Sequence, residues 1–385
     1  MNQPLADKVK SIFKEKFSTE PAMFFSPGRI NIIGEHIDYN DGFVMPAAID
    51  KGVYYAIAAN GTDTLNFYST DFEESLTIGL GDIHAIDNWK NYVLSVVNQF
   101  VQAGVDVKGF DCVFGGDIPR GSGISSSAAV EGGVAAGINF LFNNSALNPK
   151  EIALLNQRAE HDYPGVKCGI MDQFANMNGK KDHVILLDCR SIEHQYFPLK
   201  LDGYSIVLIN SKVSHSLASS EYNTRRKECG EGLQILGSDS DIRSFRDVKS
   251  ADDLLPYKER MGEKVYDRCL FVVQEIDRTQ KAAQLLQNND IAGLGKLMYG
   301  SHDGLSRLYN VSCKELDFLV EQARTNPAVL GSRLMGGGFG GCTINIIAND
   351  AIDAFIEKTL AVYEQEFGIQ AEAYTMQTAD GTHAI

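Results

Sequence analysis

Strand-like and helical stretches alternate along the whole chain, and this mixture constrains the fold more than any other feature of the sequence. Runs rich in β-branched and aromatic residues predict strands at 52–59, 66–69, 183–188, 204–210 and 343–348. Apolar spacing predicts helices at 5–17, after Gly123, and at 149–163, 221–236, 266–287 and 314–324. The clearest helix starts with Asn148 as its cap and Pro149 at its first position. Because both kinds of element occur in both halves without an internal repeat, the sequence predicts an α+β or α/β protein.

The length of the chain predicts two domains. At about 150 residues per domain, used as a soft guide, 385 residues suggest two or three compact units. The turn-rich segment at 198–203 separates two strand-rich stretches, so we place the boundary there. The expected domains are 1–199 and 200–385.

The net charge and the cysteine content indicate which partners and which cellular compartment to expect. Lys and Arg number 35 against 50 Asp and Glu, which gives a formal net charge of −15. Such a chain repels polyanions, so no nucleic-acid partner is expected. Seven scattered cysteines without a CxxC pair predict free thiols. The sequence contains no run of about 18 apolar residues, so no membrane partner is expected. We expect a cytoplasmic protein that is a monomer, with higher oligomers left open.

The first of three unusual segments is SPGRINIIGEHIDYNDGFVMPAA at 26–48. It places Arg29, Glu35, His36 and Asp38 within ten residues. Two carboxylates, an imidazole and a guanidinium offer donors and acceptors at several angles, which suits a polyhydroxylated ligand. A charged surface turn is the alternative. A metal site is less well suited, because a hard cation usually takes more oxygen ligands.

The second segment is PRGSGISSSAAV at 119–130, which leads into a helix of small residues. Glycines let a backbone approach a phosphate, and free N–H groups at a helix start point at it. The chain has no GxxxxGK[ST] motif, so this is not a Walker A loop. A glycine- and serine-rich turn without a ligand is the alternative.

The third segment is MGGGFGGC at 335–342, which contains GxGxxG. A dinucleotide-binding motif should follow a strand and open a helix. Here the preceding residues look helical and CTINIIA after the glycines looks like a strand, so dinucleotide binding is disfavoured. The glycines are expected to let a loop pack close to a ligand or to the second segment.

The stretch GIMDQFAN at 169–176 supplies a further candidate. If it lies near the ligand, Asp172 is a candidate proton acceptor that Arg29 would keep ionised. An ordinary aspartate at a helix start is the alternative.

Together, the three segments resemble the three motifs of the GHMP kinases, in the order of that family and over residues 26–342. Within the superfamily, the first segment is similar to the galactokinase signature. The resemblance implies a two-domain α+β fold, with an N-terminal ribosomal-protein-S5-like domain, a C-terminal ferredoxin-like α+β domain and the active site in the cleft between them. It also implies transfer of the γ-phosphoryl group of ATP to the 1-hydroxyl of α-D-galactose, with Mg²⁺.

Residue roles follow from the same resemblance, position by position. The implied catalytic pair is Arg29 and Asp172. The implied sugar contacts are Glu35, His36, Ile37, Asp38, Gly169 and Tyr222. The implied ATP contacts are Trp89 at the adenine and Gly121, Ser122, Gly123, Ile124, Ser125, Ser126 and Ser127 in the phosphate loop. Ser127 and Glu160 are the implied Mg²⁺ ligands.

One departure leaves the substrate open. Ile37 stands where many galactokinases have Thr, and the same form occurs in relatives that act on N-acetylgalactosamine. The following NDGFVMP resembles the ordinary galactokinase version, so galactose is expected and the acetamido sugar is the alternative. A non-catalytic galactose and ATP sensor is a second alternative, against which Asp172, Arg29 and Ser127 argue.

Overall fold

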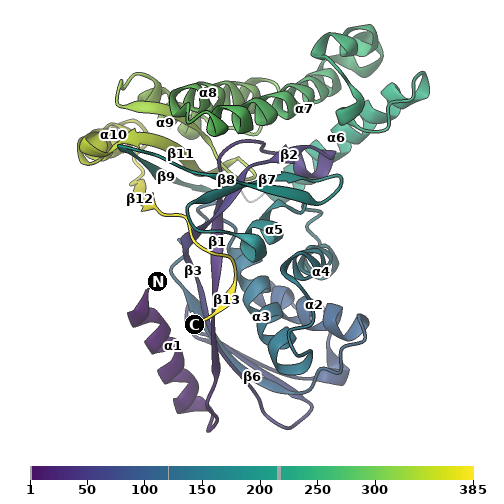
Figure 1. The fold of residues 1–385 in the computed structure, drawn as a ribbon, viewed down its shortest axis with the longest axis vertical. Helices are drawn as coiled ribbons and strands as arrows, with labels where there is room; N and C mark the ends of the chain where they lie inside the picture. The colour runs from purple at the N-terminus through teal and green to yellow at the C-terminus, as the bar shows by residue number, and fades with distance from the viewer. Residues whose placement is uncertain (1, 120, 215–217) are drawn as a thin grey trace.

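The strands of the computed structural model, which describes residues 2–119, 121–214 and 218–385, form three sheets (Figure 1). Their orders are β13-β1-β3-β6-β4-β5, β10-β11-β9-β12 and β2-β7-β8. The strands are β1 (Ala22–Asn31), β2 (Phe43–Val44), β3 (Pro46–Ala59), β4 (Thr64–Ser69), β5 (Glu74–Gly79), β6 (Phe110–Gly116), β7 (His183–Asp188), β8 (Glu193–Pro198), β9 (Tyr204–Ser214), β10 (Val329–Leu334), β11 (Gly340–Ala348), β12 (Glu372–Met376) and β13 (His383–Ala384).

Helices cover the two larger sheets. The α-helices are α1 (Gln3–Lys16), α2 (Asn88–Gln102), α3 (Ser126–Phe142), α4 (Pro149–Asp162), α5 (Met171–Asn178), α6 (Ala218–Ser238), α7 (Lys258–Gln287), α8 (Ile291–Arg307), α9 (Lys314–Arg324) and α10 (Ile352–Phe367). Short 3₁₀ turns include η1 (Asp38–Asn40), η2 (Leu80–Asp82), η3 (Phe245–Asp247), η4 (Ala251–Tyr257) and η5 (Asn349–Ala351). The mixture of strands and helices in both halves confirms the predicted α+β class.

The six-stranded sheet lies between α1 on one face and α2 and α3 on the other (Figure 1). Successive side chains of a strand point to opposite faces. Tyr54 therefore packs with α1, whereas the next residue, Tyr55, packs against α3 and donates to the Val130 carbonyl at 2.9 Å. A Cβ at Gly133 of α3 would lie 2.0 Å from the Tyr55 ring, so only glycine lets this helix come so close.

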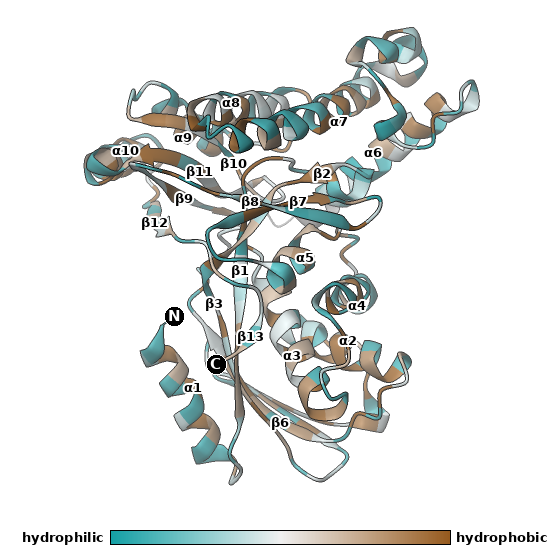
Figure 2. Cartoon of the chain, viewed as in Figure 1, coloured by the Kyte–Doolittle hydropathy of each residue, from teal (hydrophilic) through white to brown (hydrophobic). Residues whose placement is uncertain are grey.

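The four-stranded sheet also buries both faces. Ile206 and Leu208 of β9 belong to a core with α7, α8 and the end of β1, while Val207 and Ile209 belong to a core with α9 and α10. In Figure 2, hydrophobic and hydrophilic residues alternate along α7 and α8, as expected for helices with one buried face. Because β1 contributes to the first of these cores, its C-terminal end lies where the two larger sheets meet.

The end of the chain returns to the first sheet. β13 pairs with β1, with Phe24 opposite Ala384 and Phe25 opposite His383. Both labelled termini consequently lie on the same half of the molecule in Figure 1. The domain boundary expected near 198–203 stays a prediction.

Most of the predicted elements are present, and one prediction is wrong. Residues 329–334, predicted to be helical, form β10 and pair with β11. The third glycine segment therefore joins two strands, and no helix follows it directly. We also missed β1, whose Pro27 and Gly28 argue against a strand; a register shift between Pro27 and Arg29 accommodates them.

Two further observations bear on the earlier expectations. All seven cysteines lie in the described part of the chain and are unpaired, which confirms the prediction of free thiols. Over the same residues, no helix combines the length and apolar character needed to cross a bilayer.

The capping box of α4 gives a stability prediction. The Asn148 side chain accepts from the Glu151 N–H at 3.1 Å, and the Glu151 carboxylate accepts from the Asn148 N–H at 2.8 Å. We expect Asn148→Ala to lower the free energy of unfolding by about 0.5 to 2 kcal/mol, the usual cost of losing such a cap. Urea denaturation measures this, and Asn148→Ser, which keeps a cap acceptor, should lose much less. Equal losses in both variants would contradict the role of the cap.

Candidate active site

The three unusual segments meet where the two larger sheets adjoin. A Cβ at Gly28 in the first segment would lie 2.7 Å from the Ile124 carbonyl of the second. A Cβ at Gly336 in the third segment would lie 3.1 Å from the Gly123 carbonyl. The glycines therefore allow backbone-to-backbone packing, as expected for the third segment. Arg120, inside the second segment, lies outside the described residues.

A small cavity of about 140 Å³ opens at this junction. It is lined by Arg29, Glu35, His36, Asp38, Glu160, Val166, Cys168, Gly169, Met171, Asp172, Tyr222, Gly336 and Gly337. The fold thus brings together the residues expected to contact a sugar, except Ile37. The Ile37 side chain is fully buried in the core, beside Gly42 and away from the cavity lining.

Arg29 and Asp172 form a bidentate ion pair in this cavity. Arg29 Nε donates to Asp172 Oδ1 at 2.8 Å, and Nη2 donates to Oδ2 at 3.1 Å. Arg29 Nη1 donates to the Gly123 carbonyl at 2.7 Å, and the Ser125 hydroxyl donates to Asp172 Oδ2 at 2.5 Å. Arg29 is 4% exposed, whereas the Asp172 side chain is 27% exposed. The arginine is thus buried and hydrogen-bonded, whereas the carboxylate is accessible from the cavity.

Two neighbouring carboxyl groups are disfavoured as anions. Burial, and then the negative charges of Asp172 and Glu35, raise the pKa of Asp38 to about 7. Burial and the charge of Asp172 likewise raise the pKa of Glu160 to about 7. Gly169 makes room for Asp38, since a Cβ there would lie 1.9 Å from Asp38 Oδ2. The lining of the cavity therefore contains more carboxyl groups than its one arginine, Arg29, can neutralise.

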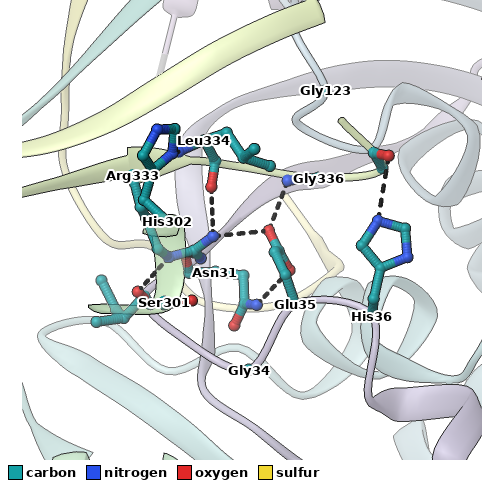
Figure 3. Close-up of polar contacts among 12 residues, drawn as sticks. Asn31, Gly34, Glu35, His36, Gly123, Ser301, His302, Arg333, Leu334 and Gly336 are labelled. Carbon is teal, nitrogen blue, oxygen red and sulfur yellow. Dashed lines mark hydrogen bonds and ion pairs between the residues drawn. The ribbon is translucent and has the colours of Figure 1, made fainter. Parts of the chain in front are cut away.

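Glu35 is buried and already has three partners (Figure 3). Its Oε2 accepts from Asn31 Nδ2 at 2.5 Å, and its Oε1 accepts from the Gly336 N–H at 2.5 Å and lies 3.3 Å from Arg333 Nη1. Arg333 is fully buried and also donates to the carbonyls of Asn31, Ile32 and Leu334. Sequence reasoning missed Asn31 and Arg333. The only signal available was the position of Asn31 within the first segment and of Arg333 just before the third.

Two glycines of the second segment adopt backbone angles that other residues seldom take. Gly121 and Gly123 have φ values of 70° and 71°, which suit glycine. Ser125 precedes α3, but its hydroxyl bonds to Asp172 instead of capping the helix. The first amides of α3 thus have no side-chain cap. Ser122 and Ile124 are buried, so these two side chains face the protein interior.

A larger cavity of about 730 Å³ lies beside the start of α3. Its walls include Phe72, Trp89, Tyr92 and Phe114, together with Ser126 and Ser127. Phe72 stacks near Trp89 at 6.5 Å between ring centres, and Trp89 Nε1 donates to Glu74 at 3.3 Å. Flat aromatic walls of this kind suit a planar heterocycle.

Ser127 and Glu160 link the two cavities. Ser127 lines the larger cavity and Glu160 lines the smaller one, and Ser127 lowers the pKa of Glu160 against the effect of burial. Within the described ranges, no group of three or more His, Cys, Asp and Glu side chains has the arrangement of a metal centre.

Comparison with known proteins agrees with this geometry. The galactokinase galactose-binding signature matches residues 11–59, and the N-terminal and C-terminal GHMP kinase domains match 91–180 and 282–364. The chain is 40% identical over 362 residues to a galactokinase of Thermotoga petrophila, covering 94% of this chain and 99% of the relative. It is also 40% identical over 387 residues to a galactokinase of Clostridium acetobutylicum, covering 99% of this chain and 98% of the relative.

A solved structure extends the agreement to the fold. The crystal structure of Lactococcus lactis galactokinase complexed with galactose superposes with a TM-score of 0.93 at 34% identity, covering 98% of this chain and 99% of that one. The expected two-domain GHMP kinase fold is thereby confirmed. The chain belongs to the galactokinase family of the GHMP kinases, enzymes that phosphorylate galactose with ATP.

Proposed function

We propose that Asp172 and Arg29 are the catalytic pair with which this chain transfers the γ-phosphoryl group of ATP to the 1-hydroxyl of α-D-galactose. The observation that carries this assignment is the bidentate Arg29–Asp172 pair at the wall of the small cavity, next to the uncapped start of α3. A sugar hydroxyl in that cavity and a phosphate at that helix start would be neighbours.

Asp172 orients the nucleophile and accepts its proton. A sugar hydroxyl is a poor nucleophile, so a carboxylate within hydrogen-bond reach assists its attack. Arg29 fixes the carboxylate with two hydrogen bonds and offsets the negative charge that develops on the transferred group. Positioning supplies much of the remaining acceleration.

The triphosphate binds along Gly121 to Ser127. The free amides at the start of α3 point at it, and the helix dipole adds partial positive charge. Mg²⁺ bound by Ser127 and Glu160 fits the donor set, since Mg²⁺ is commonly held by one or two protein groups together with substrate phosphates. When bound, it would neutralise the phosphate charge. Cytoplasmic location and the monomeric state are further proposals.

Galactose is the proposed substrate rather than N-acetylgalactosamine. Asp38, Gly169 and Tyr222 line the small cavity and offer partners for hydroxyl groups. Ile37 lies in the core instead, so the difference from Thr at this position does not reach the sugar directly. ADP release by the purified chain with Mg²⁺-ATP tests the proposal, using galactose, N-acetylgalactosamine and glucose in parallel. Turnover with the acetamido sugar alone would transfer the assignment to that substrate, and binding without turnover would indicate a sensor.

Asp172→Asn separates catalysis from binding. The amide keeps an acceptor for Arg29 but cannot take a proton, so we expect kcat to fall about 100-fold or more with the galactose dissociation constant nearly unchanged. Steady-state kinetics and calorimetry measure the two quantities. Asp353→Asn, at an exposed position of α10, is the matched control and should leave both unchanged. Near-normal turnover in Asp172→Asn would remove this residue from the mechanism.

Trp89 is a built-in reporter, because it is the only tryptophan in the chain. Since Trp89 lines the larger cavity, we expect its fluorescence to change when ATP is added and to change little with galactose alone. A titration of each ligand separately measures this. A response to galactose with none to ATP would contradict the placement of adenine beside Trp89.

The raised pKa of Asp38 makes stability depend on pH. Its pKa rises from 3.8 to about 7 on folding, so the folded state binds more protons between these values and stability falls as pH rises through this window. Asp38→Asn removes this loss of stability. We therefore expect the change in the free energy of unfolding caused by the substitution to be more favourable at pH 8 than at pH 4, by about 1 kcal/mol or more. Urea denaturation at both pH values measures the difference. An equal effect at both would show that Asp38 does not titrate in this range.

A further inference from the structure

We propose that Tyr309 is a positioning residue of the sugar cavity, because its hydroxyl belongs to a one-way chain of hydrogen bonds that reaches the cavity wall at Gly337. The chain passes through Tyr39 and His36. The inference rests on the proposed function, because it assigns Gly337 to the wall that faces galactose. Tyr309 lies outside all three glycine-rich segments, in the turn after α8.

The direction of the chain is fixed at His36. Its Nε2 lies 3.1 Å from the Gly337 carbonyl, which can only accept, so Nε2 carries the proton. Burial lowers the pKa of His36 to about 4, so the ring is neutral and Nδ1 is an acceptor. Both ring nitrogens are therefore occupied within the protein. His36 lines the cavity but holds the loop rather than a sugar hydroxyl.

Each further step then has one possible direction. Tyr39 lies 2.7 Å from His36 Nδ1 and must donate its hydroxyl proton to it. The Tyr39 oxygen then accepts from the Tyr309 hydroxyl at 2.9 Å. The Tyr309 oxygen in turn accepts from the Cys229 thiol at 3.2 Å. Burial raises the pKa of Cys229 to about 12, so the thiol keeps the proton that it donates.

The turn at 309–311 also binds the third glycine-rich segment directly, through its backbone. The Phe339 N–H donates to the Val311 carbonyl at 2.7 Å, two residues after Tyr309. A Cβ at Gly338 would lie 2.1 Å from that carbonyl, so the loop follows the segment closely. Gly337 and Phe339 are thus both tied to the turn at 309–311, one through the chain and one directly.

The backbone of His36 needs such support. Its φ is 60°, in the left-handed region that non-glycine residues seldom adopt. The ring is held at both nitrogens and packs between Tyr39, Tyr222 and Tyr309, with ring centres 5.1 to 5.9 Å apart. Removing the Tyr309 hydroxyl would therefore weaken the hold on the His36 ring, which positions the Gly337 carbonyl.

Tyr309→Phe tests the proposal, because it removes the hydroxyl and keeps the ring that packs on Phe271 at 4.6 Å. We expect KM for galactose to rise roughly threefold to tenfold, the size of effect that one lost hydrogen bond gives, with KM for ATP and kcat within about twofold. Tyr299→Phe in α8 is the matched control, since its buried hydroxyl has no hydrogen-bond partner within the described residues. It should leave all three constants unchanged. An unchanged KM for galactose in Tyr309→Phe would overturn the proposal.

A spectroscopic test does not depend on turnover. In the ¹⁵N spectrum of histidine-labelled full-length chain, identified by comparison with His36→Gln, His36 should be protonated at Nε2 and unprotonated at Nδ1. In Tyr39→Phe, the Nδ1 signal should shift because its donor is gone. Protonation at Nδ1 in the unsubstituted chain would overturn the proposed direction. If the unsubstituted chain released no ADP with galactose, the proposed function would fail, while the His36 signals would still decide whether the chain of hydrogen bonds exists.

Discussion

The carboxylate of Glu35 and the guanidinium of Arg333 form a buried ion pair, and the arrangement of the site depends on this contact. Arg333 comes from β10 of the second large sheet, while Glu35 follows β1 of the first. Burying two charges is favourable only when their remaining donors and acceptors are also paired. Arg333 meets this condition with three backbone carbonyls, and Glu35 with the Asn31 amide and the Gly336 N–H. One polar contact thus fixes the first glycine-rich segment relative to the third.

Several carboxyl groups lie close together near this contact, and their crowding lowers the stability of the empty site. Asp38 and Glu160 both have raised pKa values, since burial and the charge of Asp172 oppose their ionisation. Hydroxyl groups of a sugar, or a cation beside Glu160, would supply the missing donors or charge. The site is therefore less stable empty than filled, and ligand binding should stabilise the folded chain.

The sequence predicted local elements and most of the residues that line the small cavity, but not how distant elements combine. The α4 helix, with Asn148 and Pro149 at its start, is found as predicted, because capping is a local interaction. β10 was mistaken for helix, because its six residues gain their conformation from pairing with β11. Arg333 and Tyr309 act through contacts with residues about 270 or more positions away, so no spacing in the sequence could reveal them.

The electrostatics of the two cavities support the proposed placement of galactose and ATP. The chain carries a net charge of −15, so ATP is not attracted by the molecule as a whole. Acidic side chains gather in the small cavity, whereas the start of α3 presents uncapped amides. A triphosphate placed among the carboxylates would be repelled, and one placed at the helix start is stabilised. Ser127 lines the larger cavity and Glu160 lines the smaller one, so the two environments meet at these residues. In the proposed reaction, the transferred phosphoryl group passes from the helix start to the small cavity, and Arg29 contacts both places, through the Gly123 carbonyl and through Asp172.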